Sequence, residues 1–141
     1  MNTLLQILAT CLYAFIAIIA AVMALKSLRA REFLPFHGAA AAQPWSELGA
    51  GLQAVILSLL RLSGLGFLIV ALQLMVVAVA DNFDRGLVVT LALPLLSLSF
   101  CASLCVVNLR LHRRTGAQTP WRGSLYAAVA IAAGLVLSIL G

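Results

Sequence analysis

The chain has 141 residues, of which 64% are hydrophobic and 9% are charged. A soluble domain carries about a quarter charged residues, and a soluble chain of this length still exposes roughly a third of its unfolded surface. The composition therefore excludes an ordinary soluble globule, a disordered chain and a disulfide-stapled secreted domain. It predicts an all-α integral membrane protein with a single transmembrane domain over residues 1–141.

Four apolar stretches are long enough to cross the roughly 30 Å hydrocarbon core of a bilayer, which takes about 20 helical residues. They predict a four-transmembrane-helix bundle with spans at about residues 3–25, 52–80, 87–109 and 124–141. The third stretch contains Pro94, which is expected to kink its helix because proline lacks an amide hydrogen.

The second stretch contains Arg61, the one charged residue within a long apolar context. Residues 46–60 place apolar side chains at helical spacing, so the second helix is expected to extend into the cytoplasm as an amphipathic segment. Arg61 would then lie at headgroup level and reach toward phosphate. The alternative is an intramembrane arginine that faces the bundle and holds an anionic ligand.

Basic residues gather in the first and third loops. Seven of the nine lie there: Lys26, Arg29, Arg31, Arg110, Arg113, Arg114 and Arg122. By the positive-inside rule, these loops are predicted to be cytoplasmic and both termini to lie outside. The short second loop, residues 81–86, is slightly acidic and is expected on the outer side. We expect the protein in a bacterial cytoplasmic (inner) membrane.

The two basic loops resemble each other where they lead into the next span. Residues 42–45 read AQPW and residues 117–121 read AQTPW. A parallel two-plus-two repeat of residues 1–80 and 87–141 would produce this pattern. The alternative is convergence, because proline suits the first turn of a helix and tryptophan suits the membrane interface.

A candidate ligand site is predicted at the cytoplasmic half of the bundle, where each basic residue near the surface attracts anionic groups by about 1 kcal/mol. The residues expected there are Arg61, Arg29, Arg31, His37, Trp45 and Glu47. Trp45 would shelter the apolar part of a lipid-like ligand while Arg61 contacts its charged head. No spacing typical of metal ligands is present, so we predict neither a metal nor a cofactor. Nucleic acid is not an expected partner, because no basic face with interleaved aromatic residues exists.

Small residues recur at four-residue intervals on two of the spans. One set comprises Ala130, Gly134 and Ser138, and the other comprises Ser97, Cys101 and Cys105. In lipid, such stripes let helix backbones approach closely, so both are predicted to pack against other helices. The expected partners are membrane lipids, with further copies of this chain or a larger membrane complex as additional candidates.

Two classes of function remain open. The scarcity of polar residues in the spans favours a non-enzymatic accessory or scaffold protein, or a lipid-contacting subunit. The alternative is a membrane enzyme, because the size, four spans, outside termini and basic first loop are similar to those of the MAPEG family of glutathione-dependent enzymes. That resemblance implies a lipophilic substrate and an anionic cosubstrate at the cytoplasmic half. The family's Arg- and Asn-containing signature around the second span is not found; only Arg61 could replace its anion-binding arginine, and no catalytic residue is assigned.

Overall fold

The structure is a computed structural model that describes residues 3–80, 86 and 88–141. Four of its helices are long and apolar enough to cross a membrane, which confirms the predicted all-α four-helix fold. They are α1 (Thr3–Leu28), α3 (Ala50–Val79), α4 (Leu93–Thr115), which continues the π-helix η3 (Val88–Ala92), and α5 (Trp121–Leu140). The predicted second loop, residues 81–86, lies almost entirely outside the described residues.

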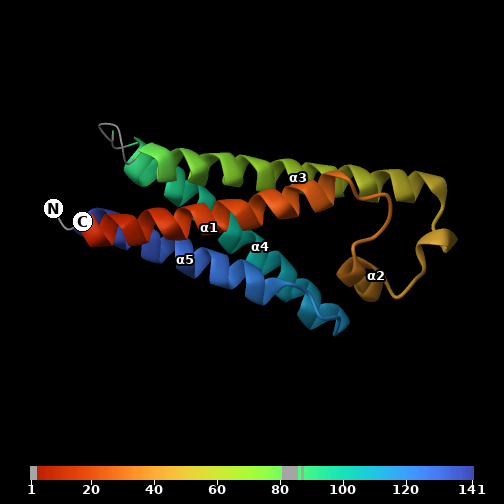
Figure 1. Cartoon of the computed structure of the whole chain (residues 1–141). Coiled ribbons are helices and arrows are strands. Elements are labelled where there is room, and N and C mark those ends of the chain that lie inside the picture. Colours follow the sequence, from red (N-terminus) through yellow and green to blue (C-terminus); the bar gives the residue numbers. More distant parts are fainter. Residues whose placement is uncertain (1–2, 81–85, 87) are drawn as a thin grey trace.

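The long helices form a closed ring in which α1 packs against α3 and α5, and α4 packs against the same two helices. The N- and C-termini lie together at one end of the bundle (Figure 1). A short additional helix, α2 (Pro35–Ala41), lies at the other end, here called the α2 end. Toward the α2 end, α3 and α5 diverge, and this divergence leaves room between the helices (Figure 1).

Helix α3 is longer than a bilayer requires. Its 30 residues span about 45 Å, whereas the hydrocarbon core is roughly 30 Å thick. This length agrees with the predicted extension of the second helix, although regular α-helix begins only at Ala50. The residues before it form a 3₁₀ turn, η1 (Trp45–Glu47), which the side chain of Gln53 ties to α3 by donating from Nε2 to the Trp45 carbonyl at 2.9 Å.

Pro94 lies where η3 gives way to α4. Proline cannot donate the regular hydrogen bond to the carbonyl four residues earlier, and a wider π turn is one way for a helix to accommodate that loss. The irregularity expected at Pro94 therefore takes the form of a π-helical segment directly before it.

The core is built where α5 crosses α1. Tyr13 of α1 is only 1% exposed, and Leu74 of α3 and Ile131 of α5 are fully buried in the same cluster. Gly134 of α5 lies directly against the Tyr13 ring, because a Cβ added at Gly134 would be 2.9 Å from Tyr13 Cε1. A glycine at this position therefore permits the close approach of α1 and α5.

A hydrogen bond between side chains joins α3 to α4. Ser97, which is fully buried, donates from Oγ to Gln73 Oε1 at 3.0 Å. Ser97 belongs to one of the small-residue stripes, but the sequence analysis did not single out Gln73. In the membrane such a bond satisfies polar groups that hydrocarbon cannot.

Candidate functional site

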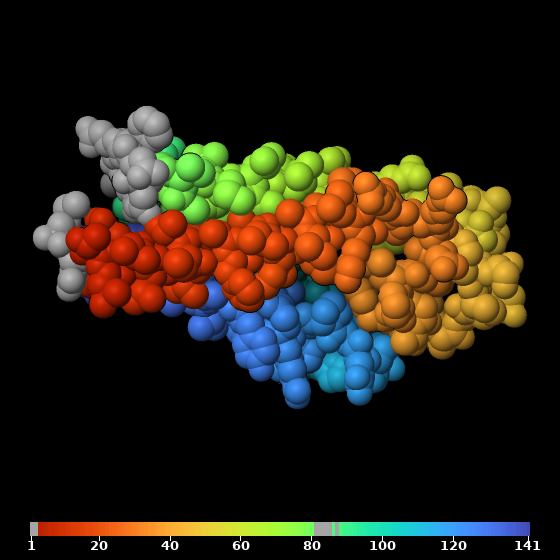
Figure 2. Space-filling view, in the orientation of Figure 1, coloured from red at the N-terminus to blue at the C-terminus, as the bar shows by residue number. Residues whose placement is uncertain are grey.

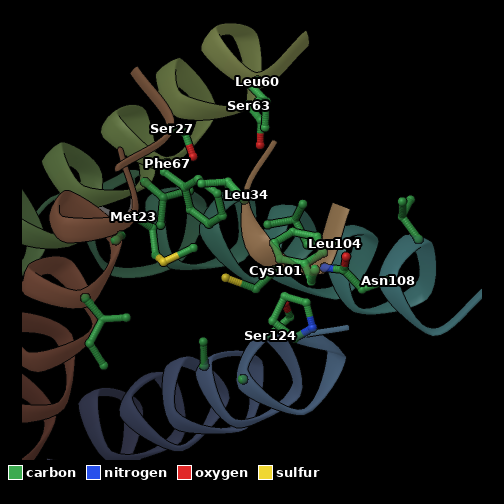
Figure 3. Close-up of a pocket in the computed structure, with 18 of the residues that line it drawn as sticks. Met23, Ser27, Leu34, Leu60, Ser63, Phe67, Cys101, Leu104, Asn108 and Ser124 are labelled. Carbon is green, nitrogen blue, oxygen red and sulfur yellow. The ribbon is translucent and has the colours of Figure 1, made fainter. Parts of the chain in front are cut away.

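A cavity of about 980 Å³ lies between the helices toward the α2 end, and all five α-helices contribute to its wall. The surface of the molecule is hollowed where α1, the segment around α2 and α5 meet (Figure 2). Figure 3 shows side chains from the surrounding helices directed into this space. The diverging ends of α3 and α5 thus border a large, partly open space that the side chains do not fill.

Helix α1 forms one long side of the cavity. Its contribution runs from Leu12 through Ile16 and Ala20 to Ser27, at the spacing of one helix face. The 15 residue steps from Leu12 to Ser27 correspond to about 22 Å along the helix axis. The opposite wall is similarly apolar, with Phe67 and Val70 from α3 among its members. An elongated apolar space of this kind suits an extended hydrocarbon chain.

The segment around α2 closes the end of the cavity. Pro35 occupies the first turn of α2, where its missing amide hydrogen costs nothing, and Ala42 ends the helix in the left-handed conformation at φ 50°. Phe33 lines the cavity and packs edge-on against Trp45, with ring centroids 5.0 Å apart. Trp45 therefore supports the cavity wall from behind.

His37 on α2 also lines the cavity, and its ring lies 3.9 Å from that of Phe36. The side chain is half-buried, and its Nδ1 atom is buried without a hydrogen-bond partner in the described part of the chain. Burial lowers the pKa of His37 below its ordinary value, because removal from water disfavours the charged imidazolium. The imidazole is therefore neutral at pH 7, with one donor and one acceptor nitrogen.

Uncharged polar side chains come from every helix around the cavity. They are Ser27 of α1, His37 of α2, Ser63 of α3, Asn108 of α4, and Ser124 and Tyr126 of α5. By contrast, none of the described residues that line the cavity is charged. Two further hydroxyls without a partner among the described residues, those of Thr10 and Ser138, do not line it.

The structure does not bring together the six residues predicted to bind an anionic ligand. His37 lines the cavity, and Trp45 packs behind its wall. The other four are exposed and do not line it: Arg29, Arg31, Glu47 and Arg61. On α3, Leu60 and Ser63 face the cavity, whereas Arg61 lies off that face. Of the six predicted residues, His37 is thus the only one that lines the cavity in the described part of the chain.

The two small-residue stripes occupy several environments. Ala130 and Cys101 line the cavity, Gly134 contacts Tyr13, and Ser97 bonds to Gln73. Ser138 and Cys105 are partly exposed. Each stripe thus contains one residue that contacts another helix, one that lines the cavity and one that is partly exposed.

Side-chain hydrogen bonds hold the loop between α4 and α5, among them one from Ala117 N to Thr115 Oγ1 at 3.2 Å. Thr119 donates from Oγ1 to the carbonyl of Asn108 at 2.7 Å, and His112 Nδ1 lies 2.7 Å from the carbonyl of Ala117. His112 thus interacts within its own loop. The described residues contain no cluster of three or more His, Cys, Asp or Glu side chains placed to hold a metal ion.

The cavity hydroxyls Ser27, Ser63 and Ser124 were not singled out from the sequence. One pattern in the sequence points to Ser27, which lies on the same face of α1 as Ile16 and Ala20 at helical spacing. No protein-family model, curated protein or solved structure matches this chain.

Proposed function

We propose that this membrane protein is a non-enzymatic lipid-binding subunit that holds the hydrocarbon chain of a lipid in the cavity between its helices. The observation that carries the proposal is the size and apolar character of that cavity, about 980 Å³. Protein interiors are close-packed and contain few voids larger than a water molecule. An apolar cavity of only about 150 Å³ is enough to bind benzene, and sites for small molecules range from about 300 to 1,000 Å³.

The length of the cavity suits one lipid chain. One leaflet accounts for half of the roughly 30 Å hydrocarbon core, or about 15 Å. The cavity face of α1, from Leu12 to Ser27, extends over about 22 Å. A single acyl or isoprenoid chain can therefore lie along α1, with its head toward the α2 end.

The orientation proposed from the sequence places the α2 end in the cytoplasm and both termini outside, in a bacterial inner membrane. The basic first and third loops support it. The position of Arg61 also supports it, because this residue lies about 16 Å from the start of α3, near the depth at which an overlong helix leaves the hydrocarbon. Its exposed guanidinium can then reach the headgroups.

The lining of the cavity favours binding over the enzymatic alternative. An anionic cosubstrate needs a cationic partner, and Arg61, the arginine that the sequence pattern favoured for this role, is exposed and does not line the cavity. The residues that line the described wall are apolar or uncharged.

The test uses a substitution that fills the cavity and a matched one that does not. Ala127 lines the cavity on α5, whereas Ala133, on the same helix, is exposed and does not line it. In phosphatidylcholine nanodiscs, Ala127→Phe should weaken binding of a pyrene-labelled long-chain alcohol about fivefold or more, since overpacking costs about 1–3 kcal/mol and 1.4 kcal/mol is tenfold. Ala133→Phe should bind like the unmodified protein. Equal binding by all three proteins, or none by the unmodified protein, would refute the proposed function.

A further inference from the structure

The polar side chains of the cavity are concentrated toward the α2 end. Ser27 is the penultimate residue of α1, and Ser124 is the fourth residue of α5. Ser63 lies at the same level as Ser27, because the neighbouring Gly64 approaches the backbone nitrogen of Leu28 so closely that a Cβ there would be 3.1 Å from it. Figure 3 shows the hydroxyls of Ser27 and Ser63 directed toward the space between the helices. The cavity is therefore amphipathic, with an apolar part and a polar end.

The hydroxyls of Ser27 and Ser63 differ from those of Ser58 and Ser99, which lie on α3 and α4 but do not line the cavity. Ser58 and Ser99 each donate to the carbonyl four residues earlier, at 2.9 and 2.8 Å. Ser27 is only 2% exposed, yet its side chain makes no hydrogen bond within the described part of the chain, and the same holds for Ser63. Back-bonding to the helix is the usual way for serine to satisfy its hydroxyl in lipid. A serine that lines the cavity and forgoes this bond has its hydroxyl available to a ligand.

Positive charge is absent from the cavity but abundant around it. The basic residues that the structure describes are all exposed and none lines the cavity; they are Lys26, Arg29, Arg31, Arg61, Arg110, Arg113, Arg114 and Arg122. A phosphate or carboxylate drawn into the cavity would lose its water without gaining a cation in exchange, which is strongly unfavourable. The cavity therefore discriminates against a charged head.

We propose that the lipid bound in this cavity carries an uncharged hydrogen-bonding head, a hydroxyl or carbonyl group, which contacts Ser27, Ser63 and His37 while its chain extends toward Val70. This inference rests on the proposed function and adds the chemical class of the ligand. Asn108 and Ser124 complete the polar end from the other side of the cavity. The neutral imidazole of His37 can donate to a carbonyl or accept from a hydroxyl through its unpartnered Nδ1.

The test compares two lipids that differ by a single phosphate. Monoacylglycerol and lysophosphatidic acid of the same chain length compete with the pyrene-labelled alcohol for the full-length protein in phosphatidylcholine nanodiscs. We expect monoacylglycerol to displace the probe at a concentration about tenfold lower or less, because the phosphate must be desolvated without a cationic partner. Equal or stronger competition by lysophosphatidic acid would overturn the uncharged-head proposal while leaving chain binding intact.

Substitutions of Ser27 and Ser63 test whether their hydroxyls contact the head of the lipid. Ser27→Ala and Ser63→Ala should each weaken monoacylglycerol binding about two- to twelvefold, the value of one hydrogen bond. Ser58→Ala is the matched control, because Ser58 lies on the same helix as Ser63 but already bonds to Ala54 and does not line the cavity. Binding of a pyrene-labelled alkane, which has no head, should be unchanged in all three variants. If the cavity variants bind monoacylglycerol as Ser58→Ala does, or lose the alkane equally, the assignment of these hydroxyls is wrong.

Discussion

The contact between Gly134 and Tyr13 offers a direct test of how the bundle is held together. A Cβ added at Gly134 would lie 2.9 Å from Tyr13 Cε1, 3.0 Å from Cζ and 3.3 Å from Cδ1. Three atoms of one rigid ring would therefore be approached at once. Tyr13 is 1% exposed, so its ring has no free space into which it can turn. Gly134→Ala must then move α5 away from α1 or distort the Tyr13 side chain.

The expected cost follows from two opposing effects. Overpacking a filled core costs about 1–3 kcal/mol, and replacing glycine by alanine inside a helix returns up to about 1 kcal/mol. Gly123→Ala on the same helix isolates the second effect, because nothing lies within 4 Å of the Cβ position at Gly123. We therefore expect Gly134→Ala to be less stable than Gly123→Ala by about 1–3 kcal/mol.

The measurement is the free energy of unfolding in mixed micelles as SDS is increased, followed by the fluorescence of Trp45 and Trp121. Replacing the ring removes the obstacle, so in a Tyr13→Leu background the added methyl at Gly134 should cost no more than it does at Gly123. The difference between the two backgrounds is a coupling energy of about 0.5–3 kcal/mol. If Gly134→Ala and Gly123→Ala unfold at the same free energy, α1 and α5 do not pack through this contact.

Two further measurements address other parts of the molecule. Gln73→Leu removes the acceptor for Ser97 Oγ. In the same SDS titration it should lower the free energy of unfolding by about 0.6 kcal/mol, and by up to about 1.7 kcal/mol. An unchanged free energy of unfolding would mean that this hydrogen bond adds nothing to the contact between α3 and α4. Because burial lowers the pKa of His37, the unfolded chain binds its proton more tightly than the folded chain, and stability falls as the pH drops through the ordinary histidine value of about 6.5. The melting temperature should therefore decrease between about pH 7.5 and about pH 5. The decrease should be smaller in His37→Gln, which retains His112. Equal decreases in the variant and the unmodified protein would show that His37 is not buried in solution.

The four long helices were predictable because the bilayer dictates them. A stretch of about 20 apolar residues has to satisfy its backbone internally, so length and composition alone predict a helix. The short helix α2 was not predicted, since a seven-residue helix lacks a hydrophobic period long enough to recognise. His37 of α2 and the preceding Phe33 line the cavity, an environment that exists only in the folded chain.

The cavity was harder to predict for a different reason. It arises where α3 and α5 diverge, and this divergence is a property of helix packing rather than of any single span. The identity of its polar residues gave little signal, because serine in a transmembrane helix usually bonds to its own backbone, as Ser58 and Ser99 do. Only the folded structure distinguishes Ser27 and Ser63 from those two.

Arg61, Arg29 and Arg31 were predicted to bind an anionic ligand because of their charge. In the structure these residues are exposed and do not line the cavity. The exposed basic residues at the α2 end act on headgroups through water, where salt screens them over about 8 Å. The cavity wall acts by desolvation, which salt does not screen, and its uncharged lining gives a phosphate no partner. Under the proposed function, a phosphate head would therefore gain no cationic partner from the described wall, whereas a hydroxyl or carbonyl head could form hydrogen bonds with the hydroxyl and imidazole groups there.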